Sequence, residues 1–113
     1  MEKRRFERVA MRSVTRVFPD GAEDGFEAFV EDIGRGGMGL YSKRPLDVDR
    51  RVTVKLEFTD RGGLNRVESV AGRVVWTNPS ENLYIVGIEF AESLSARHNA
   101  GLYAYVESEE KGR

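Results

Sequence analysis

Two short segments carry the residue types best suited to binding chemistry. The first is Arg4-Arg5-Phe6-Glu7-Arg8 near the start of the chain, and the second is Asp32-Ile33-Gly34-Arg35-Gly36-Gly37. Arginine presents planar donors that fit phosphate and also the O6/N7 edge of guanine. A carboxylate accepts hydrogen bonds from the N–H groups of guanine, and glycine lets a ligand approach the backbone closely. Together these residues predict a site for a guanine nucleotide, held at both its phosphates and its bases.

Each of these features also has a plainer interpretation. The arginines could form a solvated basic arm, and Asp32 could cap a turn through nearby backbone N–H groups. The glycines could serve a tight hairpin; they are not a Walker loop, because neither Gly-Lys-Ser/Thr nor a helix pattern follows them. Trp76, in a β-rich stretch, is most often a core residue in such a place, and the alternative is a wall beside a bound base.

The residue types argue against catalysis. The chain has no cysteine, and His98, its one histidine, lacks the companions that a metal site needs. No serine has a neighbouring base that the sequence identifies. We therefore expect a protein that is not an enzyme and that uses no metal or cofactor.

Length and composition predict a single domain over residues 1–113. A net charge of −1 and a pI of about 5.9 argue against a partner that is a long nucleic acid. No stretch is apolar enough for a signal peptide or a membrane span, so we expect a cytoplasmic protein. The basic start predicts a flexible arginine arm at about 1–8, and the acidic end predicts a frayed tail at about 108–113.

Most of the chain has the pattern of short strands. The stretches that alternate apolar and polar residues, or that are rich in β-branched and aromatic residues, are 9–18, 26–32, 38–42, 52–58, 67–76 and 84–90. Turn signals at 19–21, 61–63 and 78–82 separate several of them, and Gly72 marks a bulge or bend. Six such strands predict an antiparallel barrel or sandwich.

The C-terminal stretch differs from the rest. From Ser95 onward, small and apolar residues suit a helix, with Ser93 or Ser95 as its N-cap. One helix in this place could close the end of a barrel.

The two binding motifs, in this order and strand context, resemble those of the PilZ domain, a small bacterial receptor module for cyclic di-GMP. That family carries an RxxxR motif before its first strand and a D/N-x-S-x-x-G motif further on. The segments Gly72-Arg73-Val74-Val75-Trp76 and 85–90 resemble its later strands. The resemblance covers essentially the whole chain and implies an all-β fold, a six-stranded antiparallel β-barrel with a C-terminal α-helix.

The resemblance also implies a set of ligand contacts. In it, Arg4 and Arg8 clamp phosphates and guanine edges, Asp32 receives guanine N–H groups, and Gly37 allows close approach. The full set implied is Arg4, Arg5, Arg8, Asp32, Gly34, Gly37 and Trp76, with Lys3 and Arg35 as further contacts.

Two positions modify this expectation. A basic residue just before RxxxR accompanies an intercalated cyclic di-GMP dimer in the family, and Lys3 holds that place. The family's serine is Gly34 here, so a hydroxyl that would bond the ligand is missing. One neutral hydrogen bond is worth about 0.5–1.5 kcal/mol, so we expect weaker binding, with Arg35 as a compensating contact.

The expected function is that of a cyclic di-GMP receptor or adaptor. Ligand would order the N-terminal arm, and the new surface would bind or release an unidentified protein partner. One alternative is a PilZ-like interaction module that does not bind the nucleotide. The other is a small β-barrel that binds single-stranded nucleic acid through its basic arm and aromatics.

Overall fold

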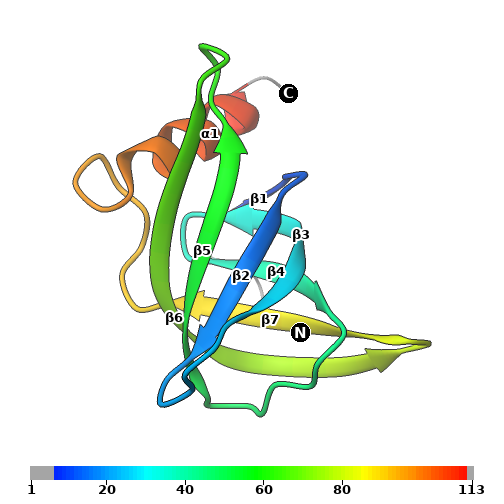
Figure 1. Cartoon of the computed structure of the whole chain (residues 1–113). Helices are drawn as coiled ribbons and strands as arrows, with labels where there is room; N and C mark the ends of the chain where they lie inside the picture. Colours follow the sequence, from blue (N-terminus) through cyan, green and yellow to red (C-terminus); the bar gives the residue numbers. More distant parts are fainter. Residues whose placement is uncertain (1–6, 112–113) are drawn as a thin grey trace.

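The chain folds into a barrel of curved strands with one helix beside it (Figure 1). The computed structural model describes residues 7–111. That range contains seven strands and a helix: β1 (Arg8–Ala10), β2 (Val14–Pro19), β3 (Phe26–Gly34), β4 (Gly37–Ser42), β5 (Arg51–Thr59), β6 (Asn65–Ser80), β7 (Leu83–Phe90) and α1 (Ala100–Lys111).

Six of the strands form a closed antiparallel ring. Its order is β3-β2-β5-β6-β7-β4, and pairing of β4 with β3 closes it. The short strand β1 is an addition, paired with the C-terminal part of β3 next to the ring. The expected six-stranded antiparallel barrel with a C-terminal helix is therefore confirmed, with one extra strand.

The barrel interior is filled by apolar residues at alternating positions along the strands. On β5, Val52, Val54, Leu56 and Phe58 are buried while the residues between them face outward. This is the period of two that a half-buried strand requires. Burying each such side chain stabilises the fold by about 1.5–3 kcal/mol.

The predicted strand over 9–18 is two strands. β1 and β2 pair with different halves of β3, and residues 11–13 join them. On the opposite edge of β3, its register against β4 shifts between Val30 and Asp32, which is a bulge in that ladder. Met11 is nevertheless buried, so the inward–outward alternation continues through the break. The residue pattern was visible in the sequence, but the break between β1 and β2 was not.

The predicted turn over 78–82 was too long. β6 continues to Ser80, which pairs with Leu83, and Pro79 pairs with Tyr84. The chain reverses at residues 81–82 alone, where Glu81 takes a positive φ of 51°.

The predicted start of the helix was also wrong. α1 begins at Ala100, and Ser95 instead closes a turn by accepting hydrogen bonds from the amides of Arg97 and His98. The N-terminal amides of α1 are capped by the carboxylate of Glu68 on β6, which accepts from the nitrogens of Gly101 (2.9 Å) and Leu102 (3.1 Å). A cap supplied by a distant strand leaves no local sequence signal.

The helix packs against the barrel through its apolar side. Leu102 and Val106 are fully buried, and the Tyr105 hydroxyl donates to the carbonyl of Ala10 on β1 at 3.0 Å. Residues 108–111, where we expected a frayed tail, belong to this helix. Within residues 7–111 no helix is long and apolar enough to cross a bilayer.

Candidate functional site

One row of cross-strand partners crosses the outer face of four neighbouring strands. Asp32 of β3 lies opposite Gly39 of β4, Gly39 opposite Gly87 of β7, and Gly87 opposite Trp76 of β6. Directly paired residues point to the same face of a sheet, so Asp32 and Trp76 flank two glycines. With strands spaced at about 4.8 Å, the row is about 14 Å wide.

The two glycines form a floor without side chains, which we call the glycine floor (Gly39 and Gly87). A Cβ on Gly87 would lie 2.2 Å from ring atoms of Trp76, so the indole rests directly on this residue. A Cβ on Gly39 would lie 3.0 Å from Oδ1 of Asp32. A side chain at Gly87 would displace the indole of Trp76, and a side chain at Gly39 would make the carboxylate ends of Glu31 and Asp32 shift.

Trp76 lies on the outer face and is not part of the core. A register shift between Val74 and Trp76 inserts one extra residue, which turns the indole outward. Gly72, where we expected the irregularity, instead packs closely against Ile88 and Glu89. The core interpretation of Trp76 was therefore wrong, and the tryptophan forms one end of the row.

Asp32 is held in place by two donors. Its Oδ1 accepts from Nη1 of Arg8 at 2.9 Å and from the amide of Gly39 at 3.1 Å. The side chains of Arg8 and Asp32 are 18% and 22% exposed, so this ion pair is partly shielded from water. The structure thus brings together one predicted arginine and the predicted acid.

The glycines of the second motif have structural reasons of their own. A Cβ on Gly34 would lie 2.6 Å from the carbonyl oxygen of Glu7 and 3.1 Å from Cδ of Arg8. A Cβ on Gly37 would lie 2.3 Å from the carbonyl oxygen of Ile88 and 3.3 Å from Nη2 of Arg8. Gly34 therefore lets β1 approach β3 closely, and Gly37 lets the backbone of β7 approach β4 with the Arg8 guanidinium nearby.

The side chain of Arg35 points toward α1 and does not join Arg8 and Asp32. Its Nη2 donates to Oε1 of Glu110 on α1 at 2.9 Å, and its guanidinium lies 5.4 Å from the centre of the Tyr103 ring. The hydrogen bond to Glu110 raises the pKa of Arg35 above its ordinary value. This side chain joins the β3–β4 turn to the helix. The predicted contacts Lys3, Arg4 and Arg5 lie outside the described residues.

The sequence analysis did not predict a hydrogen-bonded pair of side chains, Tyr41 and Glu31, next to the glycine floor. The Tyr41 hydroxyl donates to Oε2 of Glu31 at 2.9 Å, which raises the pKa of the tyrosine. Strand alternation marks Tyr41 as outward-facing, but only the register between β3 and β4 shows that the two residues meet.

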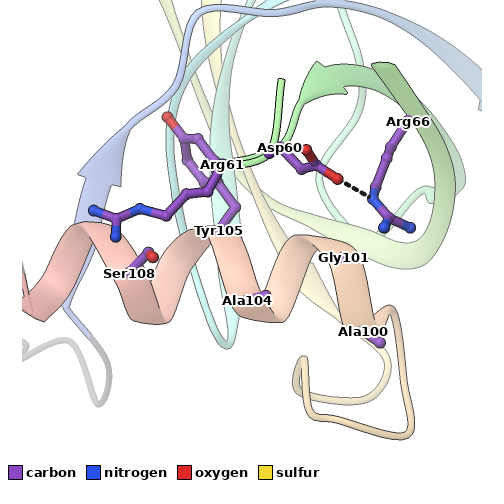
Figure 2. A pocket seen from close by; sticks show the side chains of 9 residues that line it. Asp60, Arg61, Arg66, Ala100, Gly101, Ala104, Tyr105 and Ser108 are labelled. Carbon is purple, nitrogen blue, oxygen red and sulfur yellow. Dashed lines mark hydrogen bonds and ion pairs between the residues drawn. The ribbon is translucent and has the colours of Figure 1, made fainter. Parts of the chain in front are cut away.

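A separate hollow of about 300 Å³ lies between the β5–β6 turn and α1 (Figure 2). Gly101 and Ala104 line it on the helix, and Asp60 and Arg66 form an ion pair of 2.6 Å on the hairpin. None of the glycine-floor residues lines this hollow. In the part of the chain that the structure describes, no three His, Asp or Glu side chains gather as a metal site would require.

Comparison with known proteins identifies the family. The model of the PilZ domain matches residues 2–108, and the chain therefore belongs to the PilZ family. No curated protein matches the chain in sequence.

Solved structures share the fold at low sequence identity. The Bacillus subtilis inhibitor of motility MotI/DgrA matches with a TM-score of 0.75 at 13% identity, over 100% of this chain and 54% of that one. The PilZ domain of Escherichia coli YcgR with c-di-GMP matches with 0.72 at 15% identity, over 98% and 94%. The K. pneumonia MrkH–c-di-GMP complex matches with 0.59 at 18% identity, over 81% and 45%. The chain thus spans about half the length of MotI/DgrA.

Proposed function

We propose that this domain is a receptor for cyclic di-GMP, which binds against the outer face that carries Asp32 and Trp76, whose side chains cover the glycine floor. The observation that carries the proposal is the row Asp32, Gly39, Gly87 and Trp76 on one outer face, with Arg8 bonded to Asp32, in a chain of the PilZ family. Two structural neighbours, YcgR and MrkH, are described with this nucleotide.

The groups along the row match the chemistry of the ligand. Arg8 supplies planar donors for a phosphate or the O6/N7 edge of guanine. Asp32 supplies a carboxylate for guanine N–H groups, and the indole of Trp76 supplies an aromatic surface at the edge of a base. Because Arg8 and Asp32 already contact each other, both are positioned before ligand arrives, which lowers the ordering cost of binding.

The N-terminal segment completes the proposed site. Arg4 and Arg5 would add contacts to phosphate, and Lys3 would favour an intercalated ligand dimer. Ligand would order this arm, and the new surface would signal to a protein partner. We propose a bacterial cytoplasmic location for such a receptor, and the family resemblance supports it.

One observation favours a second function. Gly34 lacks the hydroxyl of the family pattern and lies against the backbone of Glu7. A domain in which the arm occupies this place permanently would be an interaction module that binds no nucleotide.

Calorimetric titration of the purified chain with cyclic di-GMP separates these two functions. We expect heat of binding, saturation and a rise in melting temperature, since a ligand that binds only the folded state stabilises it. A stoichiometry of two ligands per domain that falls to one in Lys3→Ala would support the dimer. Absence of both heat and thermal shift at saturating ligand would favour the interaction module.

A further inference from the structure

We infer that Glu31, held by Tyr41, is a second guanine-reading carboxylate beside Asp32 and a determinant of base specificity. The inference rests on the proposed binding of cyclic di-GMP at the face that carries Asp32 and Trp76. It adds residues that neither binding motif contains, and it gives a role to an acidic side chain that is turned toward this surface.

The bulge in β3 places Glu31 on the outer face. Val30 pairs with Leu40 and Asp32 pairs with Gly39, so Glu31 is an extra residue with no partner of its own in the ladder. In a regular strand Glu31 and Asp32 would point to opposite faces. Here Val30 and Ile33 enter the core while both acidic residues stay partly exposed. Bulges often re-aim side chains next to functional sites.

Both carboxylates overhang the same glycine. The position of a Cβ on Gly39 lies 2.9 Å from Oε1 of Glu31 and 3.0 Å from Oδ1 of Asp32. The absence of a side chain at residue 39 is therefore what admits both acids. A ligand bound against this outer face would meet the two carboxylates together, because both cover the same glycine.

Tyr41 fixes the orientation of Glu31. Its hydroxyl bonds Oε2 of the carboxylate at 2.9 Å. Within residues 7–111 no donor bonds the other oxygen, Oε1, which is the atom nearest the glycine floor. One oxygen is therefore anchored, and its partner remains an acceptor at the surface where the base would lie.

The carboxylate of Glu31 is complementary to the hydrogen-bonding edge of guanine but not to that of adenine. Guanine presents two adjacent donors, N1–H and N2–H, to which a carboxylate can accept simultaneously, whereas adenine presents an acceptor at N1 and a donor at N6. A site that receives two donors rejects adenine, because the carboxylate oxygen and N1 of adenine are both acceptors and would face each other without a hydrogen bond. Cyclic di-GMP carries two guanines, so two carboxylates allow the domain to read both.

The test uses the full chain, with cyclic di-GMP and cyclic di-AMP as probes in calorimetry. We expect Glu31→Gln to lose at least about tenfold in affinity for cyclic di-GMP, since hydrogen bonds to a charged group are strong. The amide pairs with the adenine edge, so the preference for cyclic di-GMP over cyclic di-AMP should also fall. Tyr41→Phe should reduce the affinity several-fold through the loss of orientation. Glu27→Gln, an outward glutamate on the same strand, should leave binding unchanged.

The outcomes are distinguishable. If the wild-type chain binds no cyclic di-GMP, the proposed function fails and the inference fails with it. If the wild type binds and Glu31→Gln keeps both affinity and base preference, the role of Glu31 is overturned while the function stands. Thermal denaturation of each variant checks the fold; should Glu31→Gln not fold, unchanged binding by Tyr41→Phe overturns the inference.

Discussion

The ion pair of Arg8 with Asp32 predicts a variant that separates binding from folding. Because both side chains are partly exposed, the pair should contribute about 1 kcal/mol or less to stability. A charge-assisted hydrogen bond to ligand is worth about 1.5–3 kcal/mol. We therefore expect Arg8→Ala to weaken cyclic di-GMP binding by at least about tenfold with little change in melting temperature. Calorimetry and thermal denaturation measure both quantities.

The control for this variant is Arg16→Ala on β2. The Arg16 guanidinium bonds the carbonyl of Gly25 at 2.8 Å, at the exposed end of the barrel. It should bind ligand like the wild type. A large fall in the melting temperature of Arg8→Ala would show instead that Arg8 is structural.

Restoring the family's serine at Gly34 should not increase the affinity for ligand. Its φ is not in the left-handed region, so serine meets no backbone strain there. A Cβ would nevertheless lie 2.6 Å from the carbonyl oxygen of Glu7, and a backbone atom cannot step aside cheaply. We expect Gly34→Ser to push β1 from β3, lower the melting temperature and weaken binding through Arg8.

Gly62→Ser is the matched control, because a Cβ at that turn meets only Oδ1 of Asp60 at 3.4 Å. It should leave melting temperature and affinity unchanged. Tighter binding by a stable Gly34→Ser would mean that β1 yields easily and that the hydroxyl reaches the ligand.

For individual residues, the sequence predicted which residue types would matter better than it predicted which side chains would contact one another. The two motifs predicted a shared role for Arg8 and Asp32, and the structure brings them into contact. Glu31 and Tyr41 were missed because a bulge and a cross-strand register decide which side chains meet. Arg35 was expected at the ligand, but Glu110, which is far along the chain, draws it to the helix.

Among the elements, α1 depends on an acid that lies outside it. Glu68 caps two amides at its first turn, where the helix dipole also favours negative charge. Loss of an N-cap costs about 0.5–2 kcal/mol. We expect Glu68→Ala to lower the melting temperature by several degrees, as about 1 kcal/mol does in a domain of this size. Glu57→Ala, on the outer face of β5, is the control and should melt like the wild type.

The β5–β6 turn predicts a local dependence on pH. Asp60 accepts from Nε of Arg66 and from the amide of Leu64, and the bond with Arg66 is the main cause of its lowered pKa. A carboxyl with a lowered pKa in the folded state stabilises the turn at neutral pH. This contribution is lost as pH falls through that lowered pKa.

The pH effect should be confined to the turn. We expect the Leu64 amide signal in nuclear magnetic resonance to titrate below the ordinary range of an aspartate, and high salt to reduce the shift. A titration at the ordinary pKa of a free aspartate would contradict it.

Elements with strong periodicity were the easiest to predict. The alternation in β5 and β7 predicted strands correctly, because burial on one side enforces that alternation. The start of α1 was not predictable, since its cap comes from β6 and Asn99 precedes it with a positive φ of 63°.

The near-neutral net charge of the whole molecule predicts weak binding to long nucleic acids. With a net charge of −1, the chain lacks the basic field that long strands require. We expect cyclic di-GMP to displace a single-stranded oligonucleotide at physiological salt, because binding to long strands weakens steeply with salt. Fluorescence anisotropy of a labelled oligonucleotide measures the displacement. A tight oligonucleotide complex that cyclic di-GMP does not disturb would support the nucleic-acid alternative.

The β3–β4 turn has a practical consequence for building a nucleotide sensor from this domain. The carbonyls of Arg35 and Gly36 accept from the amides of Leu94 and Phe90, each at 2.8 Å. A fluorescent protein inserted there would break both bonds and separate the strands that carry the glycine floor. The turn at Gly63 is open, since a Cβ there meets nothing within 4 Å. Exposed turns tolerate insertions best, so a reporter belongs at residues 61–63.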